Sequence, residues 1–71
     1  MVVLPGYSRA YDAAEWRDAL VVVERGRIDL CGPGGGRLGF GAGEVLWLAD
    51  LTLSRLYNPG PEPAVLVAVA R

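Results

Sequence analysis

Glycine and proline interrupt this chain at short intervals, and their spacing limits it to short elements of secondary structure. Turn-forming residues occur at Pro5-Gly6, Gly26, Gly32–Gly36, Gly41–Gly43 and Asn58–Pro61. Both residue types favour turns, and both weaken the interior of a helix or strand. Short apolar or alternating segments at roughly 8–12-residue spacing, separated by turn signals, are typical of a β-sandwich or a small barrel. The sequence therefore predicts an all-β fold.

Six or seven strands are expected, because seven segments have a strand-like hydrophobic pattern. They are residues 7–11, 20–23, 27–31, 37–40, 44–48, 52–57 and 64–70. Residues 20–23 are apolar without a break, which indicates a strand that is buried on both faces or is an inner strand of a sandwich. Residues 64–70 are also apolar throughout, and we expect them in the middle of the core. Residues 27–31 and 37–40 flank a glycine run and predict a hairpin.

Two helical alternatives remain open at this stage. Residues 44–57 contain no glycine or proline and are rich in leucine, so part of this stretch could be helical, which would make the fold α+β. Residues 12–18 could form one helical turn capped by Asp12. Gly34, Gly36 and Gly39 spell the pattern GxGxxG, but a dinucleotide site needs a larger βαβ unit, so we interpret this run as a hairpin tip.

The 71 residues, 52% of them hydrophobic, predict a single domain over residues 1–71. On size scaling the folded chain exposes about 4,300 Å², and the free energy gained by burial roughly equals the cost of ordering the chain. With one cysteine and no histidine, neither a disulfide nor a usual zinc site can add stability. We therefore expect self-association, most simply a homodimer.

Charge and hydropathy limit the partners and the location. All seven basic residues are arginines, they are scattered, and eight acids oppose them, so we expect no nucleic-acid partner. The first residues lack the cationic start of a signal peptide and no run is long enough for a membrane span, which favours a cytoplasmic protein without membrane contact. Cys31 is interpreted as a small packed hydrophobic residue and not as a reactive thiol.

Four residues match the ends of two motifs of the cupin family, which are written G(X)5HXH(X)3,4E(X)6G and G(X)5PXG(X)2H(X)3N. Gly6 and Gly26 fall on the two ends of the first motif, and Gly43 and Asn58 fall on the two ends of the second. The chain resembles the cupins over residues 6–58. The resemblance implies a small β-barrel or sandwich whose interior is the functional site.

The inner positions of both motifs depart from the cupin pattern. In cupins the histidines and the glutamate hold a metal ion. At the positions of these four metal ligands the chain has Asp12, Ala14, Ala19 and Ser54. Ala49 and Leu51 replace the proline and glycine of the second motif. Two of the four ligand positions have no donor atom, so we expect no metal and no cofactor. The metal-dependent reactions of the family are therefore not carried over.

The sequence accordingly favours a metal-free binding or structural module without catalysis of its own. An alternative is a metal-independent enzyme or sensor that acts on a sugar or small acid in the barrel interior, although no histidine or lysine is present to activate a nucleophile. A regulatory subunit whose partner supplies the chemistry is a third alternative. The pocket of such a small-molecule protein would be lined by Asp12, Ser54, Arg55, Tyr57, Trp47 and Phe40. We expect a filled interior in preference to an open one, and at least one tryptophan at the dimer face.

Overall fold

A computed structural model of the protein describes residues 1–16, 19–48 and 52–70. Within these ranges the chain forms eight β-strands and no helix. The strands are β1 (Val2–Val3), β2 (Ser8–Ala10), β3 (Ala19–Arg25), β4 (Arg27–Cys31), β5 (Arg37–Gly41), β6 (Val45–Trp47), β7 (Arg55–Tyr57) and β8 (Ala64–Ala70).

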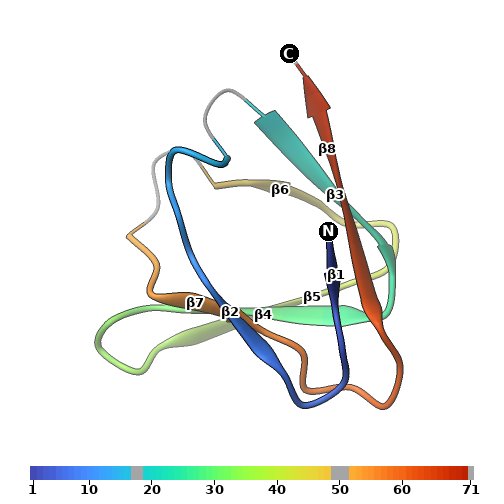
Figure 1. The fold of residues 1–71 in the computed structure, drawn as a ribbon, viewed down its shortest axis with the longest axis horizontal. Coiled ribbons are helices and arrows are strands. Elements are labelled where there is room, and N and C mark those ends of the chain that lie inside the picture. Colours follow the sequence, from blue (N-terminus) through green and yellow to red (C-terminus); the bar gives the residue numbers. More distant parts are fainter. Residues whose placement is uncertain (17–18, 49–51, 71) are drawn as a thin grey trace.

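The strands are arranged in two antiparallel sheets of four strands each (Figure 1). Sheet A has the order β1-β8-β3-β6, and sheet B has the order β2-β7-β4-β5. Strands β3 and β8 form the longest ladder, which starts at the pair Ala19 and Ala70. The two layers enclose one hydrophobic core, as in a β-sandwich.

The all-β prediction is confirmed, but the closed-barrel version of it is not. Among the described residues no strand of sheet A pairs with a strand of sheet B, so the sheets form an open sandwich. The chain passes from one sheet to the other through sharp turns at Gly26 and Gly43, where φ is 74° and 92°. These turns place β3 and β4 in different sheets, and likewise β5 and β6.

The helical alternatives do not hold in the described chain. Residues 45–47 and 55–57 are strands, and residues 49–51 between them lie outside the described residues. Residues 12–16 form a turn, in which Glu15 N donates to Asp12 O at 3.0 Å and Trp16 N donates to Ala13 O at 3.3 Å. The remainder of the predicted helical turn, residues 17–18, is also outside the described chain.

The predicted hairpin is confirmed, and the structure gives its register. Strands β4 and β5 pair Ile28 with Phe40 and Leu30 with Leu38, and Gly32 N donates to Gly36 O at 2.9 Å to close the turn. Strand β1 was not predicted, because two valines between a methionine and Leu4-Pro5 are too short a run to show alternation.

The core lies between the sheets and is built from residues of β1, β3, β4, β6, β7 and β8, together with Trp16 and Leu48, which lie outside the strands. Its buried members are Val3, Trp16, Val21, Val23, Ile28, Leu30, Leu46, Leu48, Leu56, Ala64 and Leu66. The accessible surface of 4256 Å² agrees with the area expected from chain length. The core therefore has the size that a chain of this length can bury.

Strands β3 and β8 lie inside sheet A, as expected for their apolar sequences, but they are not buried on both faces. Leu20 and Val22 of β3 are only half-buried, and Val67 and Val69 of β8 are 38% and 47% exposed. The outer face of sheet A has no described layer above it, which is the physical reason for this exposure.

Candidate functional site

The outer face of sheet A carries an uncharged apolar patch. The registers align Val67 with Val22 and Val22 with Val45, and they align Val69 with Leu20 and Leu20 with Trp47. Directly paired residues point to the same side of a sheet. With Val2 and Val65, which also pair, the patch has eight members: Val2, Leu20, Val22, Val45, Trp47, Val65, Val67 and Val69.

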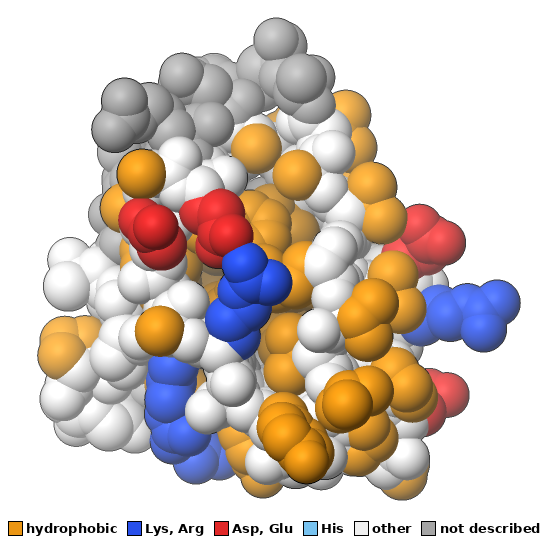
Figure 2. All heavy atoms as spheres, viewed as in Figure 1, with side chains coloured by type: hydrophobic (Ala, Val, Ile, Leu, Met, Phe, Trp, Pro, Cys, Tyr) orange, Lys and Arg blue, Asp and Glu red, His pale blue; other side chains and the backbone are white. Residues whose placement is uncertain are grey.

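Much of this patch is in contact with solvent. Val2 and Val45, on the two edge strands, are 57% and 58% exposed. In Figure 2 hydrophobic side chains gather on the side of the molecule where Figure 1 places β1 and β8. Charge enters this face at one end of the sheet, where the exposed Arg25 pairs with Val65 and the exposed Glu24 lies in the irregularity beside it. A contiguous apolar face of this kind marks an interaction surface more often than scattered apolar residues do.

The outer face of sheet B has the opposite character, because three arginines meet there. Cys31 pairs with Arg37 of β5 and with Arg55 of β7, so the two arginines flank one position of β4. Their guanidinium groups lie 5.1 and 5.5 Å from the ring centroid of Tyr57, which is cation–π geometry. Together with Arg27, they form a basic surface. The three arginines are far apart in the sequence, and the fold brings them together.

A single acid, Asp29, lies within this basic surface and is 8% exposed. Its Oδ1 is 3.7 Å from Arg27 Nε and its Oδ2 is 3.8 Å from Arg37 Nη1. Both distances exceed hydrogen-bond length, and Oδ1 accepts no hydrogen bond within the described chain. The Arg27 guanidinium lies above Gly39, where an added Cβ would come within 2.5 Å of Arg27 Nη2. The absence of a side chain at Gly39 therefore allows the arginine to lie flat on the sheet.

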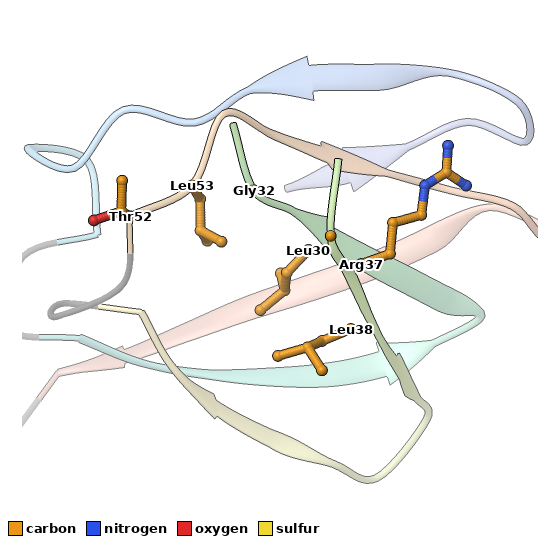
Figure 3. Close-up of a pocket in the computed structure, with 7 residues that line it drawn as sticks. Leu30, Gly32, Arg37, Leu38, Thr52 and Leu53 are labelled. Atoms are coloured by element: carbon orange, nitrogen blue, oxygen red, sulfur yellow. The ribbon is translucent and has the colours of Figure 1, made fainter. Parts of the chain in front are cut away.

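A pocket of about 330 Å³ opens between the β4–β5 hairpin and the segment before β7. Its lining is formed by Leu30, Gly32, Gly36, Arg37, Leu38, Thr52 and Leu53. The side chains of the three leucines point toward one another in Figure 3, whereas that of Arg37 extends away from them. The pocket interior is therefore apolar, and the guanidinium of Arg37 lies on the outer face of sheet B, over the Tyr57 ring.

The six residues predicted to line a pocket are spread over the molecule. Asp12 is exposed in a turn, and its Oδ1 accepts a hydrogen bond of 3.0 Å from Ala14 N. Ser54 Oγ donates a hydrogen bond of 3.0 Å to Cys31 O. Phe40 packs against the core from β5, and Trp47 is half-buried on the outer face of sheet A.

Of these six, the structure brings Arg55 and Tyr57 together on the outer face of sheet B, outside the interior where we expected them. The observed pocket is lined by other residues. Its leucines come from the β4–β5 hairpin and from the segment before β7, and no local pattern of residues indicates that these segments meet. The hairpin itself was predicted, and the pairing of Leu30 with Leu38 comes from the structure.

The four positions that match the cupin motif ends all have a distinct structural role. Gly6, Gly26 and Gly43 have positive φ angles of 76°, 74° and 92°, a backbone region that favours glycine. Asn58 is fully buried, and Gly6 N donates to Asn58 O at 2.9 Å. These residues form the turns that connect the strands.

The altered metal-ligand positions do not make a donor set for a metal ion. Ala14 and Ala19 offer no side-chain donor, and the groups at Asp12 and Ser54 bond to nearby backbone atoms. Within the described ranges, no group of three histidine, cysteine, aspartate or glutamate residues could hold a metal. The other two departures from the motifs, Ala49 and Leu51, lie outside the described residues.

Comparisons of the chain with protein-family models, with curated proteins and with solved structures give no significant match. The residues that the structure describes include no helix with the length and apolarity needed to span a bilayer. The function must therefore be inferred from the surfaces and the pocket of this chain alone.

Proposed function

We propose that this chain is a metal-free, cupin-like binding or structural module that works as a homodimer and has no catalysis of its own. The observation that carries the proposal is the uncharged apolar patch on the outer face of sheet A. The partner that we propose for the patch is a second copy of the chain.

A second copy fits the patch because an uncharged apolar face is complementary to itself. Two-fold pairing brings the same surface together from both copies, so any charge on it would face a like charge. The eight members carry no charge, so a two-fold axis through the centre of the patch, at Val22 and Val67, would bring apolar side chains together. The outer face of sheet B, with three arginines, lacks this property.

The size of the patch indicates a dimer of moderate strength. The four strands have 2, 7, 7 and 3 residues, which at about 3.3 Å per residue and 4.8 Å between strands is roughly 300 Å² of flat area and, with side-chain relief, on the order of 500 Å² per copy. Two copies would bury about 1,000 Å², the lower limit for a specific interface. We therefore expect a dissociation constant in the micromolar range.

The cupin-like part of the proposal is supported by the four motif ends and by the two-sheet architecture. Gly6, Gly26 and Gly43 occupy turns that need a positive φ, and Asn58 ties the loop before β8 to β1. Four sequence matches that coincide with four turn positions are the pattern that a shared fold would produce. The metal-free part is supported by Ala14 and Ala19 at two of the ligand positions.

The absence of catalysis is proposed because the reactive groups are dispersed. Asp12 and Ser54 each bond to backbone atoms, and the chain has no histidine or lysine to act as a base for a nucleophile. A cytoplasmic location and the absence of nucleic-acid and membrane partners also belong to the proposal. One buried cysteine without a disulfide is compatible with a reducing compartment.

The test is the mass in solution of two matched variants, measured by size-exclusion chromatography with light scattering. Val67→Lys places a charge at the centre of the patch, and Leu38→Lys places the same charge on an exposed leucine of sheet B. We expect Val67→Lys to be monomeric and Leu38→Lys to dimerise like the unmodified chain. A dimer that survives Val67→Lys, or a monomer in both the unmodified chain and Leu38→Lys, would overturn the proposal.

A further inference from the structure

We propose that the free edge of β5 accepts an extended segment of a partner protein as a fifth strand of sheet B. The segment runs antiparallel to β5, with an acidic residue opposite Gly39 and an apolar residue opposite Leu38. The proposal goes beyond the homodimer, because it assigns a second kind of partner to the other sheet.

Strand β5 is the longest edge strand among the described residues. It has five residues, whereas the edge strands β1, β2 and β6 have two, three and three. Proteins usually protect a sheet edge with a short strand, a bulge, a proline or an inward-pointing charge. The pairing of β5 with β4 has no register shift, and β5 has no proline and no charge on its inner face. Residues 37–39 are exposed, and no described strand pairs with their free side.

The backbone groups of Arg37 and Gly39 point toward this free side. Hydrogen-bonded and non-hydrogen-bonded pairs alternate along an antiparallel ladder. Gly32 N donates to Gly36 O at 2.9 Å, which identifies a hydrogen-bonded pair at the end of the β4–β5 ladder. In the register that continues from it, Arg37 and Gly39 stand in non-hydrogen-bonded pairs, so their N–H and C=O groups face away from β4. A partner strand could bond to these groups.

The turn after β5 sets the length of the open edge. The next backbone groups that face away from β4 belong to Gly41. Gly41 N donates to Glu44 Oε1 at 3.0 Å, and Gly41 O accepts from Glu44 N at 3.1 Å. Both groups are therefore occupied, and the added strand pairs with residues 37–39.

Arg27 gives the outer side of the edge a preference for an acidic residue. An added Cβ at Gly39 would lie 2.5 Å from Arg27 Nη2, so the guanidinium lies over the outermost strand of the sheet. Its contact with Asp29 Oδ1, 3.7 Å from Arg27 Nε, is too long for a hydrogen bond, and the Arg27 side chain is 62% exposed. Directly opposite residues of neighbouring strands point to the same face. A carboxylate opposite Gly39 would therefore meet the guanidinium of Arg27.

Leu38 gives the inner side of the edge a preference for an apolar residue. It pairs with Leu30, which is 2% exposed in the core, so both side chains face the inner side of sheet B. Leu38 is nevertheless 61% exposed, and no described strand lies beyond it. An apolar side chain on an added strand would lie against Leu38 and remove this surface from water.

A second copy of the chain fits this edge poorly. Two β5 strands paired antiparallel at Leu38 would place Arg37 of each copy opposite Gly39 of the other, where Arg27 lies. Like charges that are directly opposite destabilise a strand pair. The charge of the edge therefore favours an acidic partner of different sequence.

The experiment uses two capped hexapeptides, Thr-Thr-Glu-Val-Thr-Thr and Thr-Thr-Gln-Val-Thr-Thr, which differ in the charge placed opposite Gly39. Hydrogen exchange of backbone amides in the full chain, followed by NMR, reports the pairing residue by residue. We expect a dissociation constant on the order of 1 mM for the glutamate peptide and about fivefold weaker binding of the glutamine peptide.

The exchange pattern should alternate along β5. At about 5 mM glutamate peptide we expect the amides of Arg37 and Gly39 to exchange about fivefold more slowly, and the amide of Leu38, which faces β4, to be unchanged. No slowing at Arg37 and Gly39 would overturn the proposal. Slow exchange of these two amides in the concentrated chain without peptide would show that a second copy occupies the edge, and would also overturn it.

Methylation of single peptide nitrogens tests backbone pairing. In the antiparallel arrangement the N–H of the peptide's glutamate donates to Gly39 O, whereas the N–H of its valine points away from β5. We expect a methyl group on the glutamate nitrogen to weaken binding about tenfold, and one on the valine nitrogen to weaken it less than about threefold. Equal losses for the two methylated peptides would contradict strand addition.

Two arginine variants test the charge contact. Arg27→Gln removes the charge over Gly39, and Arg55→Gln removes a charge on the same face that stacks on Tyr57 of β7. We expect Arg27→Gln to bind the glutamate peptide about fivefold more weakly and to bind the two peptides equally. Arg55→Gln should bind both peptides within about twofold of the unmodified chain. Equal losses in the two variants would show general charge attraction and would contradict the role of Arg27.

Val67→Lys separates this proposal from the dimer. Since the β5 edge belongs to sheet B, we expect the monomeric variant to bind the glutamate peptide within about twofold of the unmodified chain. Loss of peptide binding in this variant would assign the peptide to the sheet A interface and would overturn strand addition at β5. Protection of Arg37 and Gly39 by peptide in a chain that never dimerises would support strand addition while overturning the dimer.

Discussion

The side chain of Asn58 donates a hydrogen bond of 2.9 Å to the backbone carbonyl of Val3, and this bond joins the loop after β7 of sheet B to β1 of sheet A. Asn58 Nδ2 also donates to Glu62 O at 2.8 Å, and its Oδ1 accepts from Gly60 N at 2.8 Å. The side chain is fully buried and acts as a connector where the chain passes between the sheets.

We expect Asn58→Ala to lower the free energy of unfolding by about 2–3 kcal/mol, because it leaves three backbone groups in or near the core without their partner. Asn58→Asp keeps the acceptor for Gly60 N but loses the amide donor. Urea denaturation of both variants measures the effect. A loss below about 0.5 kcal/mol in Asn58→Ala would contradict the connecting role.

The corner at Gly26 should be the glycine position that is most sensitive to substitution. An added Cβ there would lie 2.5 Å from Pro63 O, and the φ of 74° adds backbone strain. We expect Gly26→Ala to cost about 3 kcal/mol or more and Gly6→Ala, which has the strain without the clash, to cost about 1–2 kcal/mol. Gly34→Ala has neither and should be nearly neutral. Thermal unfolding of the three variants measures the order of their stability losses. Equal losses of stability in Gly26→Ala and Gly6→Ala would rule out the steric contact at Gly26.

Trp16 contributes to stability through its apolar surface. It is 4% exposed, and its indole N–H has no acceptor among the described residues. We expect Trp16→Phe to cost about 1 kcal/mol or less, since it also removes an unpaired donor, and Trp16→Ala to cost about 3–5 kcal/mol. Denaturant titrations of both variants test this difference. A Trp16→Phe variant as unstable as Trp16→Ala would indicate that the N–H is needed.

Cys31 should behave as a packed side chain. It is 3% exposed in the middle strands of sheet B, between Arg37 and Arg55. We expect a thiol reagent such as a disulfide of nitrobenzoate to label it slowly in native buffer and rapidly in denaturant. Rapid labelling of the native protein would favour the reactive-thiol interpretation instead.

The strand pattern was predictable from the sequence because its signals are local. Alternation over residues 27–31 and 37–40, together with the glycines between them, predicted the hairpin, whose register the structure then supplied. Turn residues likewise mark Gly6, Gly26 and Gly43. The two-residue strand β1 is too short to show alternation. Its position depends on pairing with β8 at the far end of the chain.

The candidate sites were not predictable in the same way, because they depend on contacts between distant segments. Arg37 and Arg55 become neighbours only when β4 pairs with β5 on one side and with β7 on the other. The apolar patch also depends on which face of β3 and β8 is turned outward. A run of valines fits both a doubly buried strand and a strand with one open face, so its composition alone could not predict the patch.

Sedimentation equilibrium of the unmodified chain between about 1 and 200 μM tests the central claim, self-association through the outer face of sheet A, most directly. The chain has a mass of 7.6 kDa. We predict a reversible rise to twice this mass over the concentration range, with a dissociation constant in the micromolar region. A mass of one chain at every concentration would contradict the account, because the patch of eight apolar side chains would then remain exposed to water.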